Sequence, residues 1–233
     1  MAEQLIVNFE FLAHQSFASF FAGNNEEIVN HLRASAEGLD SFLIYLWGAD
    51  GLGKTHLLSA SCKHAHGLKR SVFYLDLMQA KADNAGLLIG LDGYDLVCLD
   101  NIQAIAGMLN WEHELFHFFN LPRHDKQRLI VAADCHPSQL KLHLNDLTTR
   151  LNWGLTLKLQ SFTDEQILAA LRFKATQMGF DLSEAAAKFL LTHYQKDWVL
   201  LSALLEKLAH ASLAKQRKLT LSFVKKALVD ASE

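Results

Sequence analysis

The residues most suited to chemistry form a glycine-rich loop, GADGLGKT, which runs from Gly48 to Thr55. Its glycines let the backbone wrap around a phosphate, so that backbone N–H groups and the start of a following helix face the anion. Lys54 would contact the terminal phosphates, and the Thr55 hydroxyl would bind magnesium. The loop lies between a strand-like run and a helix-like segment, as this motif requires. We therefore predict that the whole loop binds a nucleotide, through Gly48, Ala49, Asp50, Gly51, Leu52, Gly53, Lys54 and Thr55.

A second apolar run, DLVCLDN, ends at Asp100 and Asn101. An Asp at the end of such a strand commonly completes the magnesium site of a phosphate-binding loop, so we expect Asp100 to act with Thr55. Many motor ATPases carry a Glu at the next position, where it prepares the attacking water. Asn101 occupies that position here, and an amide cannot accept a proton as a carboxylate does. The motif leaves open whether the nucleotide is hydrolysed or only held.

A competing motif, HELFH, matches the H-E-x-x-H pattern of zinc peptidases. His113 and His117 would bind the metal from one face of a helix, and Glu114 would act as the base. The match fixes only three residues in a chain with 12 histidines, and a third ligand is not obvious, although His124 and His136 are candidates. The segment also has the pattern of an amphipathic helix after the DLVCLD strand, so zinc hydrolysis is the weaker alternative.

The elements that must position these residues follow a regular order. Five continuous apolar runs predict strands of a parallel sheet buried on both faces, at residues 43–47, 71–77, 95–100, 128–134 and 155–159. Helix-like segments separate them, which indicates a doubly wound α/β layer. After residue 160 the pattern changes to four helix-like segments without strands, the first with a capping box from Thr163 to Gln166. We expect a tail at 1–10, an α/β nucleotide-binding domain at 11–160 and a small all-α domain at 161–233.

Bulk composition excludes several classes of protein. With 233 residues, 50% of them hydrophobic and 20% charged, the chain can bury a core without disulfides and is too polar throughout for a membrane span. The N-terminus lacks the features of a signal peptide, so we expect a cytoplasmic protein. Cys62, Cys98 and Cys135 are expected to be buried, reduced thiols. The formal charge of -3 gives no basic footprint, so direct binding of DNA is not expected.

Beyond the loop, three further segments occur in order: DNIQAIAG, AADCHP and DLTTRLNWGLTLKL. Together with the loop they resemble the DnaA-like family of AAA+ ATPases, and more closely its shorter regulatory members of the Hda type. The resemblance covers essentially the whole chain, from FASFFAGNNEEIVNHL at residues 17–32 to KQRKLTLSFVKKAL near the end. It implies a P-loop AAA+ core with an all-α lid. No DNA-binding helix-turn-helix domain of the initiator is expected to follow, which favours a regulator over the initiator.

The resemblance implies roles for individual residues. Asp100 corresponds to the Walker B acid, Asp134 to sensor 1, and Arg150 to the arginine finger that completes the nucleotide site of a partner. The segment at 17–32 would lie against the base of the nucleotide, with Phe20 and Asn24 as contacts. Without the family, Arg150 could equally be a surface cation in a loop or a helix C-terminal cap.

Two departures from the family pattern concern hydrolysis. The sensor 2 position, usually an Arg in the third lid helix, aligns with Val199, and Asn101 replaces the second Walker B acid. Together they argue for weak or absent intrinsic ATPase activity. The bound nucleotide, ADP or ATP with magnesium, would then be mainly structural, because occupancy at about 100 times Kd stabilises a fold by about 2.7 kcal/mol.

The N-terminal stretch EQLIVNF resembles the short peptide by which such regulators dock on the DNA sliding clamp, through Gln4, Leu5, Val7 and Phe9. A short edge strand on the chain's own domain is the alternative. Several basic residues near the C-terminus could touch DNA held in the clamp, although a solvated helix face explains them better: Lys215, Arg217, Lys218, Lys225 and Lys226.

The resemblance thus implies a clamp-tethered negative regulator of replication initiation, which stimulates hydrolysis of the ATP bound to DnaA. A self-sufficient AAA+ ATPase, such as a helicase loader, is the alternative. The oligomeric state is left open, a homo-oligomer included, and no membrane partner is expected.

Overall fold

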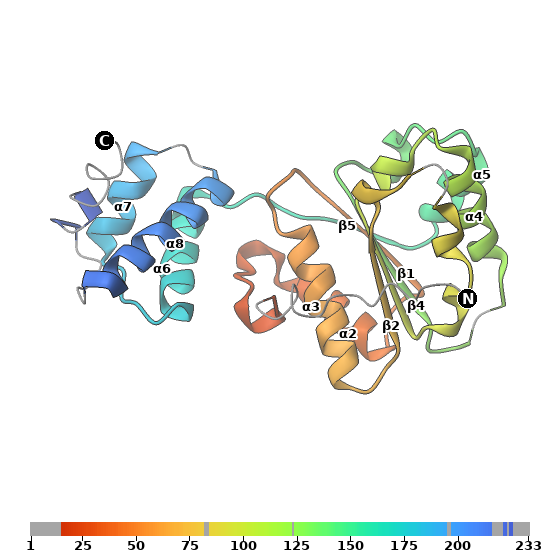
Figure 1. The fold of residues 1–233 in the computed structure, drawn as a ribbon, viewed down its shortest axis with the longest axis horizontal. Coiled ribbons are helices and arrows are strands. Elements are labelled where there is room, and N and C mark those ends of the chain that lie inside the picture. The colour runs from red at the N-terminus through yellow and green to blue at the C-terminus, as the bar shows by residue number, and fades with distance from the viewer. Residues whose placement is uncertain are drawn as a thin grey trace. The chain divides into compact units, whose positions relative to one another are not determined.

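The computed structural model describes residues 15–81, 84–122, 124–194, 197–215, 221–222 and 224–225 of the chain. These residues fall into two compact units (Figure 1). Residues 15–20 and 25–160 belong to the first unit, and residues 21–24 and those after 160 belong to the second. The residues of the predicted clamp-binding tail, Gln4, Leu5, Val7 and Phe9, lie outside the described residues.

A five-stranded parallel sheet forms the centre of the first unit, with strand order β2-β3-β4-β1-β5. Each strand begins and ends within one residue of its prediction, and the α/β class is confirmed. Because the strands are parallel, the segments that follow β1, β3 and β4 meet at one edge of the sheet. The strands are β1 (Leu43–Trp47), β2 (Val72–Asp76), β3 (Leu96–Asp100), β4 (Arg128–Ala133) and β5 (Leu155–Lys158).

Helices cover both faces of this sheet (Figure 1). Helices α2 (Glu26–Glu37) and α3 (Lys54–Gly67) lie on one face, and α4 (Leu109–Asn120) and α5 (Asn145–Leu151) lie on the other. Short 3-10 turns make most of the connections: η1 (Phe17–Ser19), η2 (Gly23–Asn25), η3 (Leu77–Gln79), η4 (Ala85–Leu88), η5 (Leu91–Gly93), η6 (Ile102–Ile105) and η7 (Pro137–Gln139).

The strands are apolar on both faces because helices bury both faces. Residues of β3 and β4 pack against α4 and α5 in one cluster, which includes Val97, Leu99, Leu129, Val131, Trp111, Leu115, Leu147 and Leu151. All of these side chains are fully buried. The core therefore holds α4 and α5 firmly on the sheet, and with them the residues that precede β5.

The three cysteines are free thiols. Cys62 and Cys98 are fully buried, as the sequence predicts, whereas Cys135 is only half-buried because it lies beyond the end of β4. Burial raises the pKa of Cys98, and it raises the pKa of Cys135 to about 11. Both thiols therefore stay protonated near neutral pH.

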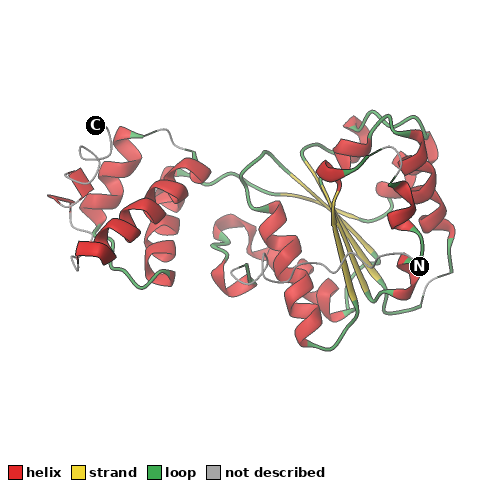
Figure 2. Cartoon of the chain, in the orientation of Figure 1, coloured by secondary structure: helices red, strands yellow, loops and turns green. Residues whose placement is uncertain are grey.

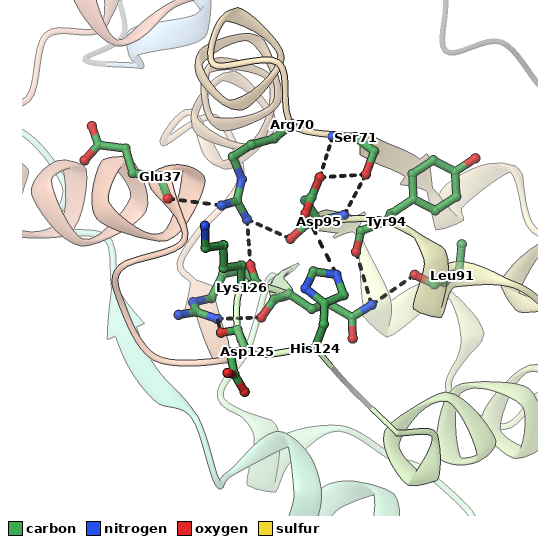
Figure 3. A network of polar contacts seen from close by, with 11 residues as sticks. Glu37, Arg70, Ser71, Leu91, Tyr94, Asp95, His124, Asp125 and Lys126 are labelled. Carbon is green, nitrogen blue, oxygen red and sulfur yellow. Dashed lines mark hydrogen bonds and ion pairs between the residues drawn. The ribbon is translucent and has the colours of Figure 1, made fainter.

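A polar network joins the edge of the sheet where the strands begin (Figure 3). Arg70 donates to the carbonyl oxygen of Glu37 at 3.1 Å, and to those of Asp95 and Lys126 at 3.0 and 2.7 Å. The Asp95 carboxylate accepts the backbone N–H and the hydroxyl of Ser71, both at 2.8 Å. Burial opposes ionisation of Asp95, but these bonds outweigh it and lower the pKa of the carboxyl group. The network ties the end of α2 to the starts of β2 and β3.

The described part of the second unit consists of helices, without a strand (Figure 2). They are α6 (Asp164–Gln177), α7 (Glu184–His193) and α8 (Trp198–Lys215). The predicted capping box is confirmed: the Thr163 hydroxyl accepts from the backbone of Gln166, and the Gln166 side chain accepts from the backbone of Thr163. Apolar side chains from all three helices form a separate core, among them Ile167, Leu171, Leu190, Leu201 and Leu205.

Candidate functional site

The glycine-rich loop connects β1 to α3, as its motif requires. Gly51 (φ 78°) and Gly53 (φ 91°) adopt the left-handed conformation, which turns the loop into the start of the helix. A Cβ on Gly53 would lie 2.8 Å from Cε2 of Phe20, so only glycine fits here. Phe20 also meets the His56 ring edge-on, with 5.3 Å between ring centroids. Phe20, which the family resemblance assigns to the nucleotide base, therefore packs directly against the loop.

Lys54 begins α3 and is 6% exposed. Its ammonium group donates to the carbonyl oxygens of Gly48 at 2.7 Å and Ala49 at 2.9 Å, and the exposed Asp50 carboxylate lies 3.6 Å away. The cation is thus held beside the backbone of the loop. This is the place from which a lysine of such a loop contacts phosphate.

Asp100 ends β3, and its side chain is fully buried. Its Oδ2 accepts the hydroxyl of Thr55 at 2.6 Å and that of Tyr74 at 3.1 Å, and its Oδ1 accepts the backbone N–H of Asn101 at 2.9 Å. Burial raises the pKa of Asp100, and the nearby Asp76 carboxylate adds to this, while the hydrogen bonds oppose it. Hydroxyl and carboxylate oxygens suit magnesium, which would also compensate the buried charge. The two residues predicted to bind magnesium are in contact and fit that ion.

Asn101 lies directly after β3 in the left-handed conformation (φ 57°), which Asn adopts more readily than Glu. Its side-chain nitrogen donates to the carboxylate of Asp76 at 2.8 Å, and its side-chain oxygen accepts from Gln103 at 3.3 Å. Asp76 ends β2 in register with Asp100. The amide therefore links the ends of two neighbouring strands, at a position where a motor ATPase would carry a base.

Asp134 and Asn24 are both exposed. Asp134 follows β4 at the same edge of the sheet as the loop, since the backbone N–H of Gly48 donates to the carbonyl oxygen of Ala133 at 3.3 Å. Asn24 lies in η2 and belongs to the second unit by its contacts. The role of Asp134 as sensor 1 and the contact of Asn24 with a base stay predictions.

Sequence reasoning missed Tyr74, Asp76 and His56. The run SVFYLDL has an acidic residue, Asp76, one position before its end, and DLVCLD ends in Asp100. Because parallel strands bring such ends together, Asp76 had a visible signal. No pattern marks His56, whose Nε2 lies 2.9 Å from the carbonyl oxygen of Ser16 and joins α3 to the segment before η1.

Arg150 lies in the last turn of α5. Its Nη1 donates to the carbonyl oxygen of Phe119, near the end of α4, at 3.2 Å. Its Cζ lies 4.8 Å from the centre of the Phe116 ring and 5.1 Å from that of Trp153. Within the described parts of the chain, Arg150 forms no ion pair with a carboxylate. No carboxylate of the described residues therefore compensates its charge through an ion pair.

Arg150 and the glycine-rich loop lie at opposite edges of the sheet. The loop follows the end of β1, whereas Arg150 precedes the start of β5, the parallel neighbour of β1. Gly154 fixes this arrangement, because a Cβ there would lie 2.4 Å from the carbonyl oxygen of Leu43, at the start of β1. At about 3.3 Å per residue, the length of β1 separates the two by roughly 15 Å. That distance exceeds the reach of an Arg side chain.

Glu112 connects the two regions through the backbone. Its fully buried carboxylate accepts the N–H of Gly107 at 2.8 Å and the N–H of Leu144 at 2.9 Å. Gly107 follows the η6 turn beyond the Walker B strand, and Leu144 is the N-cap of α5. The position of α5, which carries Arg150, is thus tied to the segment after Asp100.

The HELFH motif lies in α4. His113 and His117 are exposed, and Glu114 is half-buried. Among the residues that the structure describes, no three potential metal ligands lie together. The motif is therefore accounted for as part of an amphipathic helix that packs on the sheet. None of the described helices is both long and apolar enough to cross a membrane.

Val199 lies in the first turn of α8, where its N–H donates to Asp197 at 2.7 Å and its side chain is 52% exposed. An aliphatic side chain supplies no cation at the sensor 2 position. Of the basic residues near the C-terminus, Lys225 lies with Nζ 5.2 Å from the centre of the Phe189 ring. The side chain of Lys215, and the residues Arg217, Lys218 and Lys226, lie outside the described part of the chain.

A phosphate-binding loop on a five-stranded parallel sheet, with Asp100 at the end of β3 in contact with Thr55 of the loop and a helical unit after the sheet, defines a P-loop protein of the AAA+ class. Residues 13–158 match the family model of the bacterial DnaA ATPase domain, and residues 164–228 match that of the Hda lid domain. The chain therefore belongs to the bacterial DnaA ATPase domain family, and its lid is of the Hda type.

Solved structures share this fold at low sequence identity. Domain III of the Thermotoga maritima replication initiation protein DnaA has a TM-score of 0.76 and 21% identity, over 93% of this chain and 96% of that one. AMPPCP-bound DnaA from Aquifex aeolicus has a TM-score of 0.73 and 20% identity, over 94% and 69%. The Thermotoga maritima RuvB Holliday junction branch migration motor has a TM-score of 0.66 and 16% identity, over 94% and 72%.

Proposed function

We propose that the chain is a cytoplasmic negative regulator of replication initiation that acts on DnaA. In this proposal it holds an adenine nucleotide with magnesium, docks on the sliding clamp through its N-terminal tail, and stimulates hydrolysis of the ATP bound to DnaA. Arg150 would complete the DnaA site and leave the initiator in its ADP-bound, inactive form. The matches to the DnaA ATPase domain and to the Hda lid support this role.

The position of Arg150 carries the proposal. The guanidinium lies at the edge of the sheet opposite its own phosphate loop, about one strand length away. It also has no carboxylate partner among the described residues. A finger at this place serves a phosphate bound by another molecule. Neutralising the charge that develops on a γ-phosphate is worth about 10³ to 10⁵ in rate.

The chain's own site is suited to holding a nucleotide rather than hydrolysing it. Thr55 and Asp100 supply oxygen ligands for magnesium, which when bound neutralises phosphate charge, and Lys54 supplies a cation at the loop. Asn101 supplies no base, and Val199 supplies no cation. The similar DnaA structure from Aquifex aeolicus holds AMPPCP, which favours an adenine nucleotide here as well.

The clamp contact is proposed from the sequence of the tail. Gln4, Leu5, Val7 and Phe9 have the character of an extended peptide whose side chains enter pockets of a partner. Alanine at Gln4 and Leu5 should abolish binding to immobilised clamp without changing thermal unfolding of the chain. Unchanged clamp binding by that variant contradicts this part of the proposal.

The test of the whole proposal measures ATP hydrolysis by purified DnaA with DNA-loaded clamp and this chain. The chain is added intact, as Arg150→Ala, or as Arg172→Ala, which removes an exposed Arg from α6 and serves as the matched control. We expect stimulation by the intact chain and the control, and its near-complete loss in Arg150→Ala. Equal stimulation by all three chains contradicts the role of Arg150, and absence of stimulation by the intact chain contradicts the proposed function.

A self-sufficient ATPase is the second candidate, and Asp76 is the observation that favours it. Its carboxylate lies at the same edge of the sheet as Asp100, one strand away and in register. If Asp76 replaces the missing Walker B glutamate, the isolated chain turns over ATP and Asp76→Asn abolishes the turnover. Under our preferred proposal, the isolated chain shows little turnover, and Asp76→Asn leaves the stimulation of DnaA nearly unchanged.

A further inference from the structure

We infer that Trp153 is the positioning residue of the Arg150 finger: together with Phe116 it holds the guanidinium between two aromatic rings before any partner is bound. The contacts of Arg150 with the two rings do not depend on the proposed function, whereas their consequence for hydrolysis rests on the function proposed above.

The guanidinium of Arg150 forms three contacts within the described part of the chain. Both ring centres lie within about 6 Å of Cζ, the range in which an aromatic face attracts a guanidinium. Cζ lies 4.8 Å from the ring centre of Phe116 and 5.1 Å from that of Trp153. The hydrogen bond from Nη1 to the carbonyl oxygen of Phe119, at 3.2 Å, fixes the rotation of the group between the rings. Three contacts thus hold one flexible side chain.

The side chain of Trp153 is 65% exposed. An indole with most of its surface in water contributes little to a core, so packing does not explain its place in the sequence. Its contact with Arg150 does explain it, since Trp offers the most favourable aromatic face for a cation.

The turn that carries the Trp153 indole is held in place by contacts of its backbone. The backbone N–H of Trp153 donates to the carbonyl oxygen of Arg150 at 3.1 Å. The next residue, Gly154, lies so close to Leu43 that no Cβ fits. The backbone of Trp153 is therefore fixed against β1. A guanidinium held by such a turn has already lost much of the side-chain entropy that binding would otherwise cost.

Arg33 offers an internal comparison. Among the described residues, its Cζ lies over one ring, that of Phe17, at 5.3 Å, and Arg33 is at an exposed helix position. One ring at an exposed site is a common surface contact, whereas contacts with two rings and a carbonyl oxygen restrict the orientation of the Arg150 guanidinium. The difference indicates that the contacts of Arg150 orient its guanidinium.

The first arm of the test uses the chain alone, and therefore does not depend on the proposed function. The Nε–H signals of the arginines are recorded by NMR in the intact protein and in Trp153→Phe and Trp153→Leu. The Arg150 signal is assigned with Arg150→Lys, and Arg172 is the control. We expect ring currents to displace the Arg150 signal in the intact protein and in the Phe variant, and the Leu variant to move it toward the Arg172 signal. An Arg150 signal that is the same in the Leu variant and the intact protein overturns the inference that Trp153 positions Arg150.

The second arm measures DnaA hydrolysis at saturating chain. We expect Trp153→Leu to lower the maximal stimulation about two- to five-fold, the factor that matches one cation–π contact at an exposed site. Trp153→Phe should restore most of it. In an Arg150→Ala background, Trp153→Leu should have no further effect, because the indole acts through Arg150. Equal activities of the Leu and Phe variants, or a further loss in that background, overturn the positioning role. Because Trp153 is exposed, all variants should keep the unfolding temperature of the intact chain.

The two arms separate the two hypotheses. If the intact chain fails to stimulate DnaA while the Arg150 signal still depends on Trp153, the proposed function is wrong, but the inference that Trp153 positions Arg150 is supported. If the intact chain stimulates DnaA, and Trp153→Leu gives the same Arg150 signal and the same stimulation as the intact chain, the positioning role of Trp153 is wrong and the proposed function is supported.

Discussion

Replacing Glu112 by Gln tests the link between the segment after β3 and helix α5, which carries Arg150. The carboxylate is fully buried, and each of its oxygens accepts one backbone N–H, from Gly107 at 2.8 Å and from Leu144 at 2.9 Å. Gln has nearly the same size and shape, but it has a single oxygen. Its NH₂ group must therefore face one of the two backbone donors.

The expected cost follows from this exchange. The variant loses a hydrogen bond to a charged group, worth about 1.5–3 kcal/mol, and leaves a backbone N–H without an acceptor, which costs about 1–3 kcal/mol. These contributions overlap, so we expect the free energy of unfolding to fall by about 3 kcal/mol. Glu114→Gln, on the same helix but half-buried and within the HELFH motif, should change it by less than about 0.5 kcal/mol.

Urea unfolding at neutral pH, followed by circular dichroism and extrapolated linearly to water, measures both variants. The comparison within one helix removes effects of helix propensity, which are nearly the same for the two substitutions. If Glu112→Gln and Glu114→Gln are equally stable, Glu112 does not hold Gly107 and Leu144 together, and the reasoning is wrong.

Other variants test single contacts. Gly53→Ala forces a left-handed alanine, at about 1–2 kcal/mol, and adds a clash, so it should lower the free energy of unfolding by at least about 2 kcal/mol. Gly67→Ala, where a Cβ meets nothing within 4 Å, should be neutral or stabilising in the same assay. Because the pKa of Asp95 is lowered in the folded state, its stabilisation is present above its ordinary pKa of 3.8 and is lost as the pH falls below that value. The difference between wild type and Asp95→Asn, about 1 kcal/mol near pH 6, should therefore shrink toward zero as unfolding is measured down to pH 3. ADP with magnesium should raise the thermal unfolding midpoint, and Thr55→Val should remove the magnesium-dependent part, because valine offers no oxygen ligand.

The sheet and the loop could be predicted because their signals are local. An apolar run of five residues, such as LIYLW, indicates a buried strand by itself. The segment GADGLGKT indicates a phosphate-binding loop by itself, because its glycines let the backbone wrap around a phosphate. The class and the order of elements follow from these runs. The contact between Thr55 and Asp100 could also be predicted, because the carboxyl ends of parallel strands meet at one edge.

The remaining site residues depend on register and on backbone conformation, which the sequence does not reveal. Tyr74 reaches Asp100 only because β2 pairs with β3 in the register that aligns Asp76 with Asp100. Glu112 acts on two turns far apart in sequence. The sequence indicates only that Asn101 replaces a base, whereas its left-handed backbone and its hydrogen bond to Asp76 give it a structural role.

In the proposed function, Arg150 acts on a nucleotide bound by another chain. The most direct measurement loads DnaA with radiolabelled ATP and loads this chain with AMPPCP, so that only the DnaA site can hydrolyse its nucleotide. The two proteins are mixed with DNA-loaded clamp, and labelled ADP on recovered DnaA is measured over time. We predict that labelled ADP accumulates on DnaA, and that Arg150→Ala abolishes the accumulation. Hydrolysis that occurs only when this chain carries hydrolysable ATP, at a rate independent of Arg150, contradicts the claim.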